Sequence, residues 1–199
     1  IDKSRYEVTP VGIKKDGSWW LYSGDIGLIP DGRWENCPDN LPAFLVPDAS
    51  VGGLLILDSD HSDTVKKIDC VIPVLHGKNG EDGTIQGLLQ LAGIPFVGCD
   101  MTSSAACMDK VITNVMLEQA GIPQARFTWL YAYEFQSAPD EAVLKIEKDM
   151  GSYPVFVKPA NAGSSVGVSK AENREELRAA IAKAAKEDGK ILIEENIVG

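Results

Sequence analysis

Two glycine-rich segments carry the side chains that are best suited to chemistry. Residues 76–83 read His-Gly-Lys-Asn-Gly-Glu-Asp-Gly, and residues 157–167 read Val-Lys-Pro-Ala-Asn-Ala-Gly-Ser-Ser-Val-Gly. Each segment follows a short apolar run that is typical of a buried strand, and open α/β sheets tend to bind ligands at the carboxyl ends of their strands. The pair therefore predicts a site for phosphate and a small polar substrate.

The second segment favours phosphate. Lys158 supplies a point charge at the predicted strand end, and the backbone N–H groups of a short Gly/Ser loop can close over phosphate oxygens. The loop residues are Gly163, Ser164, Ser165, Val166 and Gly167. Their order is not that of a Walker A loop, and a solvated glycine hairpin is the alternative. The Val-Lys-Pro lead-in and the later apolar strand at 191–195 favour a nucleotide.

The first segment is open to two interpretations. His76 and Glu81 can orient a substrate or a catalytic group, and the neighbouring glycines relieve backbone strain. Glu81 and Asp82 also precede a helix that is predicted to start at Thr84, where anions favour the helix dipole. A well-capped helix without a functional role explains this segment equally well when it is taken alone.

For two further side chains, Lys110 and Glu194, the residue type alone does not decide between a functional and a structural role. Lys110 lies in the first turns of a predicted helix, where a solvated lysine is the ordinary account. Glu194 ends the last predicted strand, where it can accept a hydrogen bond from an adenine amino group or simply be an exposed acid. Glu195 is assigned no role.

Composition excludes several classes of protein. The 199 residues carry a net charge of -10, which argues against nucleic acid binding but leaves room for a local positive pocket for ATP. Four cysteines without C-x-x-C spacing predict free thiols in a reducing compartment, and three of them sit among apolar or small residues where packing is expected. Two histidines assemble no zinc site. No apolar stretch approaches the ~20 residues of a membrane helix, and we expect no signal peptide because residues 1–6 lack an apolar core. We expect a cytoplasmic protein.

The pattern of apolar residues predicts an α/β fold. A hairpin is expected at 6–22, irregular surface with short strands at 23–50, strands at 53–57, 70–75 and 94–97, and a helix from Thr84 to Ala92. Strand, helix and strand in this order indicate a right-handed crossover onto a parallel sheet. The second half is expected to be α+β. It combines one helix from Ser103 to about residue 120, helices at 139–150 and 173–188, and strands at 126–131, 153–158, 166–170 and 190–195.

These residues together resemble the D-alanine–D-alanine ligase family of the ATP-grasp superfamily. The matching segments are 74–87, 92–98, 104–105 with 108–110, 157–159 with 163–167, and 193–195. Their order and spacing agree with the family over nearly the whole chain. The resemblance implies an N-terminal parallel-sheet pre-ATP-grasp domain at 1–98 and a central ATP-grasp subdomain at 99–199.

The resemblance also implies a reaction. ATP phosphorylates the carboxylate of one D-alanine, and the amine of a second D-alanine attacks the acyl phosphate, so that D-alanyl-D-alanine for peptidoglycan is formed. The implied roles are phosphate binding by Lys110 and Lys158, cover by the 163–167 loop, substrate-side hydrogen bonding by Ser164, adenine binding by Glu194 and the backbone of Ile197, and a first D-alanine site beside His76 and Glu81.

Other family features fall outside the 199 residues. The resemblance implies a strand and a helix before Ile1, and a third domain after Gly199 that holds a lid, an arginine and the ligands for Mg²⁺ (or Mn²⁺). We therefore expect these 199 residues to be inactive alone. The resemblance also implies that the protein forms the homodimer usual in the family. The alternatives are a ligase that joins D-alanine to D-serine or D-lactate, as in vancomycin resistance, and a truncated paralogue that binds nucleotide without catalysis.

Overall fold

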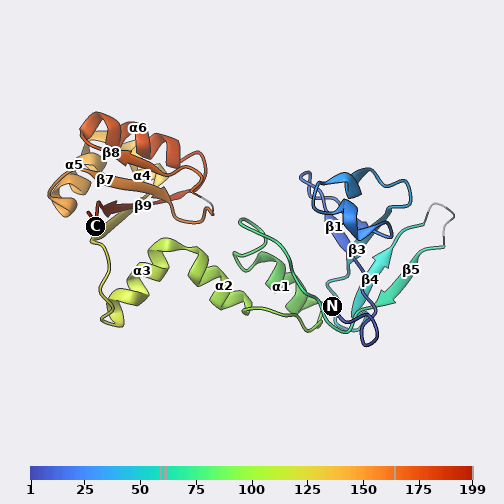
Figure 1. Ribbon diagram of the computed structural model, residues 1–199. Helices are drawn as coiled ribbons and strands as arrows, with labels where there is room; N and C mark the ends of the chain where they lie inside the picture. The colour runs from blue at the N-terminus through green and yellow to red at the C-terminus, as the bar shows by residue number, and fades with distance from the viewer. Residues whose placement is uncertain (59, 61, 164, 199) are drawn as a thin grey trace. The chain divides into compact units, whose positions relative to one another are not determined.

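A computed structural model describes residues 1–58, 60, 62–163 and 165–198 (Figure 1). The chain divides into two compact units. The first contains Ile1–Ile72 and Leu88–Val97, and the second contains Pro73–Gly87 and Gly98–Gly199. The helices of the described residues include none that is long and apolar enough to cross a membrane.

The first unit is built on a five-stranded antiparallel sheet. Its strands follow the chain order: β1 (Val11–Ile13), β2 (Trp19–Leu21), β3 (Leu41–Leu45), β4 (Gly53–Ile56) and β5 (Thr64–Lys67). The predicted hairpin is confirmed, because Val11 pairs with Leu21 across the Asp-Gly turn. Two short 3-10 helices, η1 (Ile26–Leu28) and η2 (Arg33–Asn36), fill the irregular stretch before β3. Ala43, Leu54 and Ile56 form a small core.

The prediction of a parallel sheet in this unit is wrong for the main sheet, whose strands all pair antiparallel. Most of its strands follow one another through loops too short for a parallel pair, which needs a crossover of roughly a dozen residues or more. Parallel pairing occurs at one described bridge, where Val71 pairs with Phe96. That bridge spans α1 (Thr84–Leu91), so the predicted crossover is present in reduced form. The strand expected at 70–75 is limited to this bridge; Pro73 has no N–H to extend a ladder.

The helix predicted from Ser103 is two helices. They are α2 (Met101–Met108) and α3 (Lys110–Gln119), separated at Asp109, whose ψ of 104° is extended rather than helical. The Asp109 carboxylate accepts hydrogen bonds from the amides of Val111 (3.0 Å) and Ile112 (3.1 Å). An aspartate that bonds the following backbone in this way ends one helix and caps the next. The cap of α2 is Asp100, which accepts from the amide of Ser103.

The second unit carries a four-stranded antiparallel sheet of order β6-β9-β7-β8. The strands are β6 (Phe127–Tyr131), β7 (Val155–Pro159), β8 (Ser169–Ala171) and β9 (Lys190–Glu195), and the helices are α4 (Ala132–Ser137), α5 (Pro139–Met150) and α6 (Arg174–Ala184). The bounds of α5 are those predicted, because Pro139 opens the helix and Gly151 ends it with a φ of 74°. The side chain of Asn173 caps α6 at the amide of Glu176, as expected.

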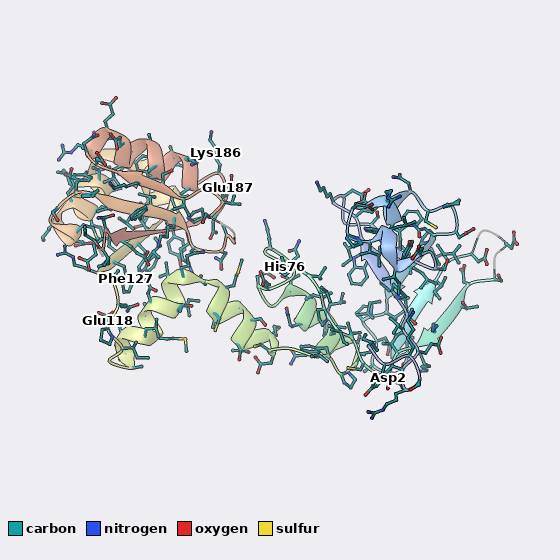
Figure 2. The ribbon with its side chains drawn as sticks, in the orientation of Figure 1. Asp2, His76, Glu118, Phe127, Lys186 and Glu187 are labelled. Carbon is teal, nitrogen blue, oxygen red and sulfur yellow. The ribbon has the colours of Figure 1, made fainter. Side chains whose placement is uncertain are left out.

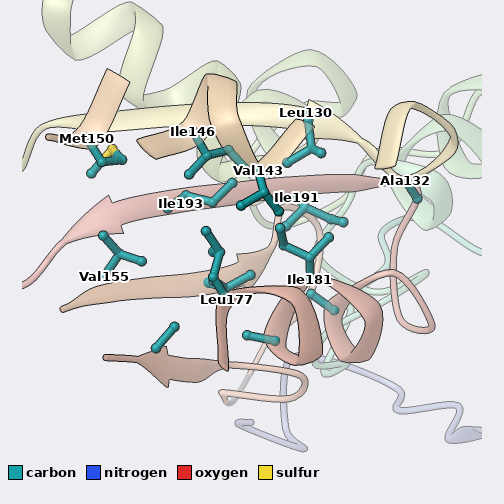
Figure 3. Packing of buried hydrophobic residues seen from close by; sticks show 14 residues of the cluster. Leu130, Ala132, Val143, Ile146, Met150, Val155, Leu177, Ile181, Ile191 and Ile193 are labelled. Carbon is teal, nitrogen blue, oxygen red and sulfur yellow. The ribbon is translucent and has the colours of Figure 1, made fainter. Parts of the chain in front are cut away.

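The main core of this unit lies between the sheet and α4–α6 (Figure 3). The predicted apolar stripe of α6 contributes Leu177, Ala180, Ile181 and Ala184 to it. Apolar side chains of β7 and β9 complete it, so the strands are anchored from one side. All four thiols are free, as predicted, but the predicted packing is wrong for Cys70, Cys99 and Cys107, which are exposed.

Candidate active site

The face of the second sheet that looks away from the main core carries polar groups. Successive side chains of a strand point to opposite faces. Val157 and Ile193 therefore lie in the main core, whereas Lys158, Leu192 and Glu194 lie on the other face. The pairing of Lys158 with Leu192 across β7 and β9 brings Lys158 diagonally beside Glu194. This face is where the side chains predicted to bind nucleotide converge.

Lys158 and Glu194 form an ion pair, with 28% and 15% of their side chains exposed. The other carboxylate oxygen of Glu194 accepts a hydrogen bond from Asn114 Nδ2 at 3.0 Å. Sequence reasoning did not find Asn114; it lies 80 positions from Glu194, and an asparagine within a helix carries no recognisable signal. The structure thus places Glu194 between a lysine of the sheet and an amide of α3.

Lys110 is the first residue of α3, and the account of a solvated lysine does not hold for it. Its Nζ donates to the carbonyls of Ala162 (2.7 Å) and Ala160 (3.2 Å). Burial first, and then the nearby charge of Lys158, lower the pKa of Lys110 below its usual 10.5. Two neighbouring positive charges beside a backbone loop favour an anion at this position.

Gly163 and residues 165–167 are the described part of the second glycine-rich loop, and Gly167 lies against Pro159 at the end of β7. The amide of Val166 donates to the carbonyl of Gly163 (3.1 Å), and Ser165 has a φ of 61°. A Cβ at Gly167 would meet Pro159 Cγ at 2.6 Å and Glu187 Cγ at 3.0 Å, so this position requires glycine. Ser164, the predicted substrate-side hydroxyl, lies outside the described residues.

The loop at 76–83 is held largely by its own acids. Glu81 accepts from the amide of Gly77 (2.6 Å), and Asp82 accepts from the amides of Asn79 (2.8 Å) and Thr84 (3.1 Å). The His76 side chain is 89% exposed, with Nδ1 3.9 Å from Glu81 Oε1, and projects from the loop (Figure 2). Asp82 serves the start of α1, as the capping interpretation of this segment expects, while the role of His76 toward a ligand stays a prediction.

The two glycine-rich segments belong to the same compact unit. A Cβ built at Gly163 would lie 3.7 Å from the Cα of Gly77. Ile197, predicted to contact adenine through its backbone, follows β9 and has an exposed side chain. Among the described residues, no group of three or more His, Cys, Asp or Glu side chains is arranged to hold a metal ion.

Comparison with known proteins gives two matching family models. The model described as D-ala D-ala ligase N-terminus matches residues 1–99, and the model described as D-ala D-ala ligase C-terminus matches residues 116–199. Together they leave only residues 100–115 unmatched.

Relatives of known sequence and structure agree with these models. The D-alanine–D-alanine ligase of Caldicellulosiruptor bescii is 49% identical over 197 residues, which is 99% of this chain and 53% of that protein. That of Acetivibrio thermocellus is 46% identical and is covered to 55% of its length. The chain thus spans about half the length of the relatives it matches.

Two solved structures share the fold over the whole chain. The VanG D-Ala:D-Ser ligase of Enterococcus faecalis has a TM-score of 0.88 at 38% identity, with 55% of its chain covered. The D-alanine–D-alanine ligase of Coxiella burnetii has a TM-score of 0.78 at 27% identity, with 56% covered.

Proposed function

Because the chain belongs to the D-alanine–D-alanine ligase family, we propose that the protein carrying it joins two D-alanines at the expense of ATP. In this reaction a D-alanine carboxylate takes the γ-phosphoryl group and ADP leaves. The amine of a second D-alanine then attacks the acyl phosphate, so that the peptide bond forms and inorganic phosphate leaves. The dipeptide serves peptidoglycan synthesis.

One observation carries this proposal: Lys110, Lys158 and Glu194 converge on one face of a sheet beside a Gly/Ser loop. We assign phosphate binding to the two lysines and cover of the phosphates to the 163–167 loop. An ATP phosphate chain offers Lys158 a partner in place of Glu194, and the released carboxylate can then accept from the adenine amino group. Ile197 would contact the same base through its backbone. Phosphoryl transfer depends on this kind of positioning and charge stabilisation.

The substrate side is assigned to His76, Glu81 and Ser164. The approach of Gly77 to Gly163 supports this assignment, because it brings the two glycine-rich segments to one place in the second unit. Glu81 acts there by shaping the loop, since its carboxylate holds the Gly77 amide, while His76 has room to contact the first D-alanine. We expect Ser164→Ala to lower kcat more than it lowers ATP affinity, and equal losses in both would contradict the substrate-side role.

A requirement for Mg²⁺ or Mn²⁺ is proposed only because the family resemblance implies it. The described residues offer no cluster that fits Mg²⁺ or Mn²⁺. We propose that the metal ligands lie in the part of the full-length protein that corresponds to the half of the relatives not matched by this chain. We further propose domains at 1–98 and 99–199, a cytoplasmic location and a homodimer.

A second candidate is a ligase that joins D-alanine to D-serine. The specific observation in its favour is the VanG D-Ala:D-Ser ligase, which shares more identity and a higher TM-score with this chain than the Coxiella enzyme does. The 49% and 46% identical relatives, which are named D-alanine–D-alanine ligases, favour the first candidate.

The test is phosphate release by the full-length protein with ATP, Mg²⁺ and D-alanine, with and without D-serine. We expect phosphate release with D-alanine alone and a dipeptide of two alanines by mass spectrometry. A mixed dipeptide formed in preference would establish the second candidate. Nucleotide binding without phosphate release under either condition would leave a non-catalytic binding protein and overturn both ligase functions.

A further inference from the structure

A network of polar side chains, of which Asp109 is buried and the others are half-buried, adjoins Lys110 but has no part in the assignments above. It joins three stretches of the second unit: the start of α3, the residues after β7 and the start of β9. Its members are Asp109, Asn161, Asp188 and Lys190. The network contains one ion pair, between Lys190 and Asp109, and hydrogen bonds that join Asn161 to Asp188 and Asp109. Its effect on Lys110 can be followed contact by contact.

Asp109 is the centre of the network. It is only 4% exposed, and one of its oxygens caps α3 at the amides of Val111 and Ile112. The other oxygen accepts from Lys190 Nζ at 2.5 Å. Burial opposes ionisation of this carboxyl, but the bonds from Lys190 and the α3 amides outweigh it and hold its pKa below the usual value. The start of α3 is thereby tied to the first residue of β9.

The residues after β7 are tied to the same point. Asp188 accepts from the backbone amide of Asn161 (2.6 Å) and from its Nδ2 (3.0 Å). The amide of Ala160 donates to the carbonyl of Lys190 at 2.9 Å. The backbone at 160–162 is therefore fixed relative to Lys190, and Lys190 is fixed relative to Asp109.

This backbone decides where the Lys110 ammonium points. The amide of Lys110 donates to the carbonyl of Ala160 (3.1 Å), and its Nζ donates to Ala160 and Ala162. An ammonium has three donors, and the two carbonyls take two of them. Among the described residues no further partner is recorded, which leaves one N–H for a phosphate oxygen. The direction of this N–H depends on the 160–162 carbonyls being held in place.

We propose that Asp109, through its ion pair with Lys190, is a positioning residue of the phosphate site, which sets the direction of the Lys110 donor that no described residue takes. The proposal rests on the proposed function, because it takes Lys110 to bind phosphate. Asp109 touches no substrate in this scheme; it acts only through Lys110 and the 160–162 backbone.

A double-mutant cycle between Asp109 and Lys110, measured on ADP affinity, tests the positioning role of Asp109. Calorimetry measures the Kd of ADP for the full-length protein and for Asp109→Asn, Lys110→Met and the double variant. Asparagine keeps an oxygen to cap α3 but loses the ion pair. We expect Asp109→Asn to weaken ADP binding about tenfold in the wild-type background and less than about twofold in the Lys110→Met background. Lys190→Met, which breaks the same ion pair from its more exposed partner, should reproduce this pattern even if Asp109→Asn folds poorly.

Equal losses in both backgrounds, or no loss in either, would overturn the positioning role, because a purely structural defect adds to the loss of Lys110. The matched control is Asp140→Asn, which removes an exposed acid paired with Arg178 and should leave ADP affinity unchanged. Failure of the proposed function would look different: the wild-type protein would not bind ADP, or Lys110→Met would bind it as well as wild type.

Discussion

The two faces of the β6-β9-β7-β8 sheet are made by the same strands and differ in nearly every physical respect. On one face, fourteen buried apolar residues pack beneath α4–α6 (Figure 3). On the other face, a small apolar cluster of Val111, Ala160 and Leu192 is surrounded by lysines, acids and amides. β9 shows the contrast within six residues, since Ile191 and Ile193 enter the core while Lys190 and Glu194 carry charge.

The contrast separates two kinds of order. The core face is fixed by the burial of apolar surface, which is strong and non-directional. The polar face is fixed by directional bonds between groups distant in sequence, such as Asn114 with Glu194 and Asp109 with Lys190. Changes to the first face should therefore appear as lost stability, and changes to the second as altered ligand binding.

Leu177→Ala tests the core face and should have the largest effect. Leu177 is fully buried in α6, and its truncation should lower the free energy of unfolding by about 3 kcal/mol, because transfer and cavity terms add. Urea denaturation measures the loss. Leu144→Ala, on the exposed side of α5, is the matched control and should cost less than about 0.5 kcal/mol. Comparable losses for the two variants would contradict the location of the core.

Lys158→Ala tests the polar face. Loss of a charged phosphate partner should weaken ATP binding by about 2 kcal/mol, or about thirtyfold, while unfolding changes little. Calorimetric titration of the full-length protein measures the affinity. Lys170→Ala removes an exposed lysine of β8, paired with Glu172, and serves as the control. Unchanged ATP affinity in Lys158→Ala would exclude the phosphate role of this lysine.

The pH dependence of ADP affinity tests the environment of Lys110. The pKa of Lys110 is lowered by burial and by Lys158, whereas a phosphate binds the protonated ammonium. Affinity should therefore be complete below this lowered pKa and fall as pH rises through it, by at most about tenfold per pH unit. Lys110→Arg stays charged, so its loss should begin at higher pH. Identical alkaline profiles for the two proteins would show that Lys110 does not contact phosphate.

Asn173→Ala should give the smallest effect. The side chain caps α6 at the amide of Glu176, and its removal should lower the free energy of unfolding by about 1 kcal/mol with no change in ADP affinity. Chemical denaturation and calorimetry measure the two quantities. Asn173→Asp keeps a capping oxygen and should restore the stability; if it does not, the cap is not what stabilises α6.

The elements that the sequence predicts best are those with local signals. α5 lies between Pro139 and Gly151, and α6 begins at the capping pair Asn173 and Glu176, so a few neighbouring residues specify each boundary. The hairpin of β1 and β2 follows from its Asp-Gly turn in the same way. These features need no knowledge of the remaining chain.

The failures have the opposite origin. The break between α2 and α3 is at Asp109, whose partner Lys190 is 81 positions away, so an apolar stripe alone predicted one continuous helix. The antiparallel order of the first sheet depends on β3 and β5, and neither was foreseen as a defined strand. In the candidate site, glycines and lysines were identifiable from type and spacing, whereas Asn114 and the Asp109 network depend on tertiary contacts.

The discontinuity of the second compact unit has a consequence for inheritance. Its residues come from Pro73–Gly87 and from Gly98–Gly199, while Leu88–Val97 belongs to the first unit. A single genetic crossover between two related genes cannot exchange one unit cleanly. A crossover before Pro73 transfers Leu88–Val97, which is part of the first unit, together with the second unit. A crossover before Gly98 combines the His76 loop of one parent protein with residues 98–199 of the other. Homologous exchange in this family is thus expected to preserve viable sites when residues 73–199 are inherited as one block.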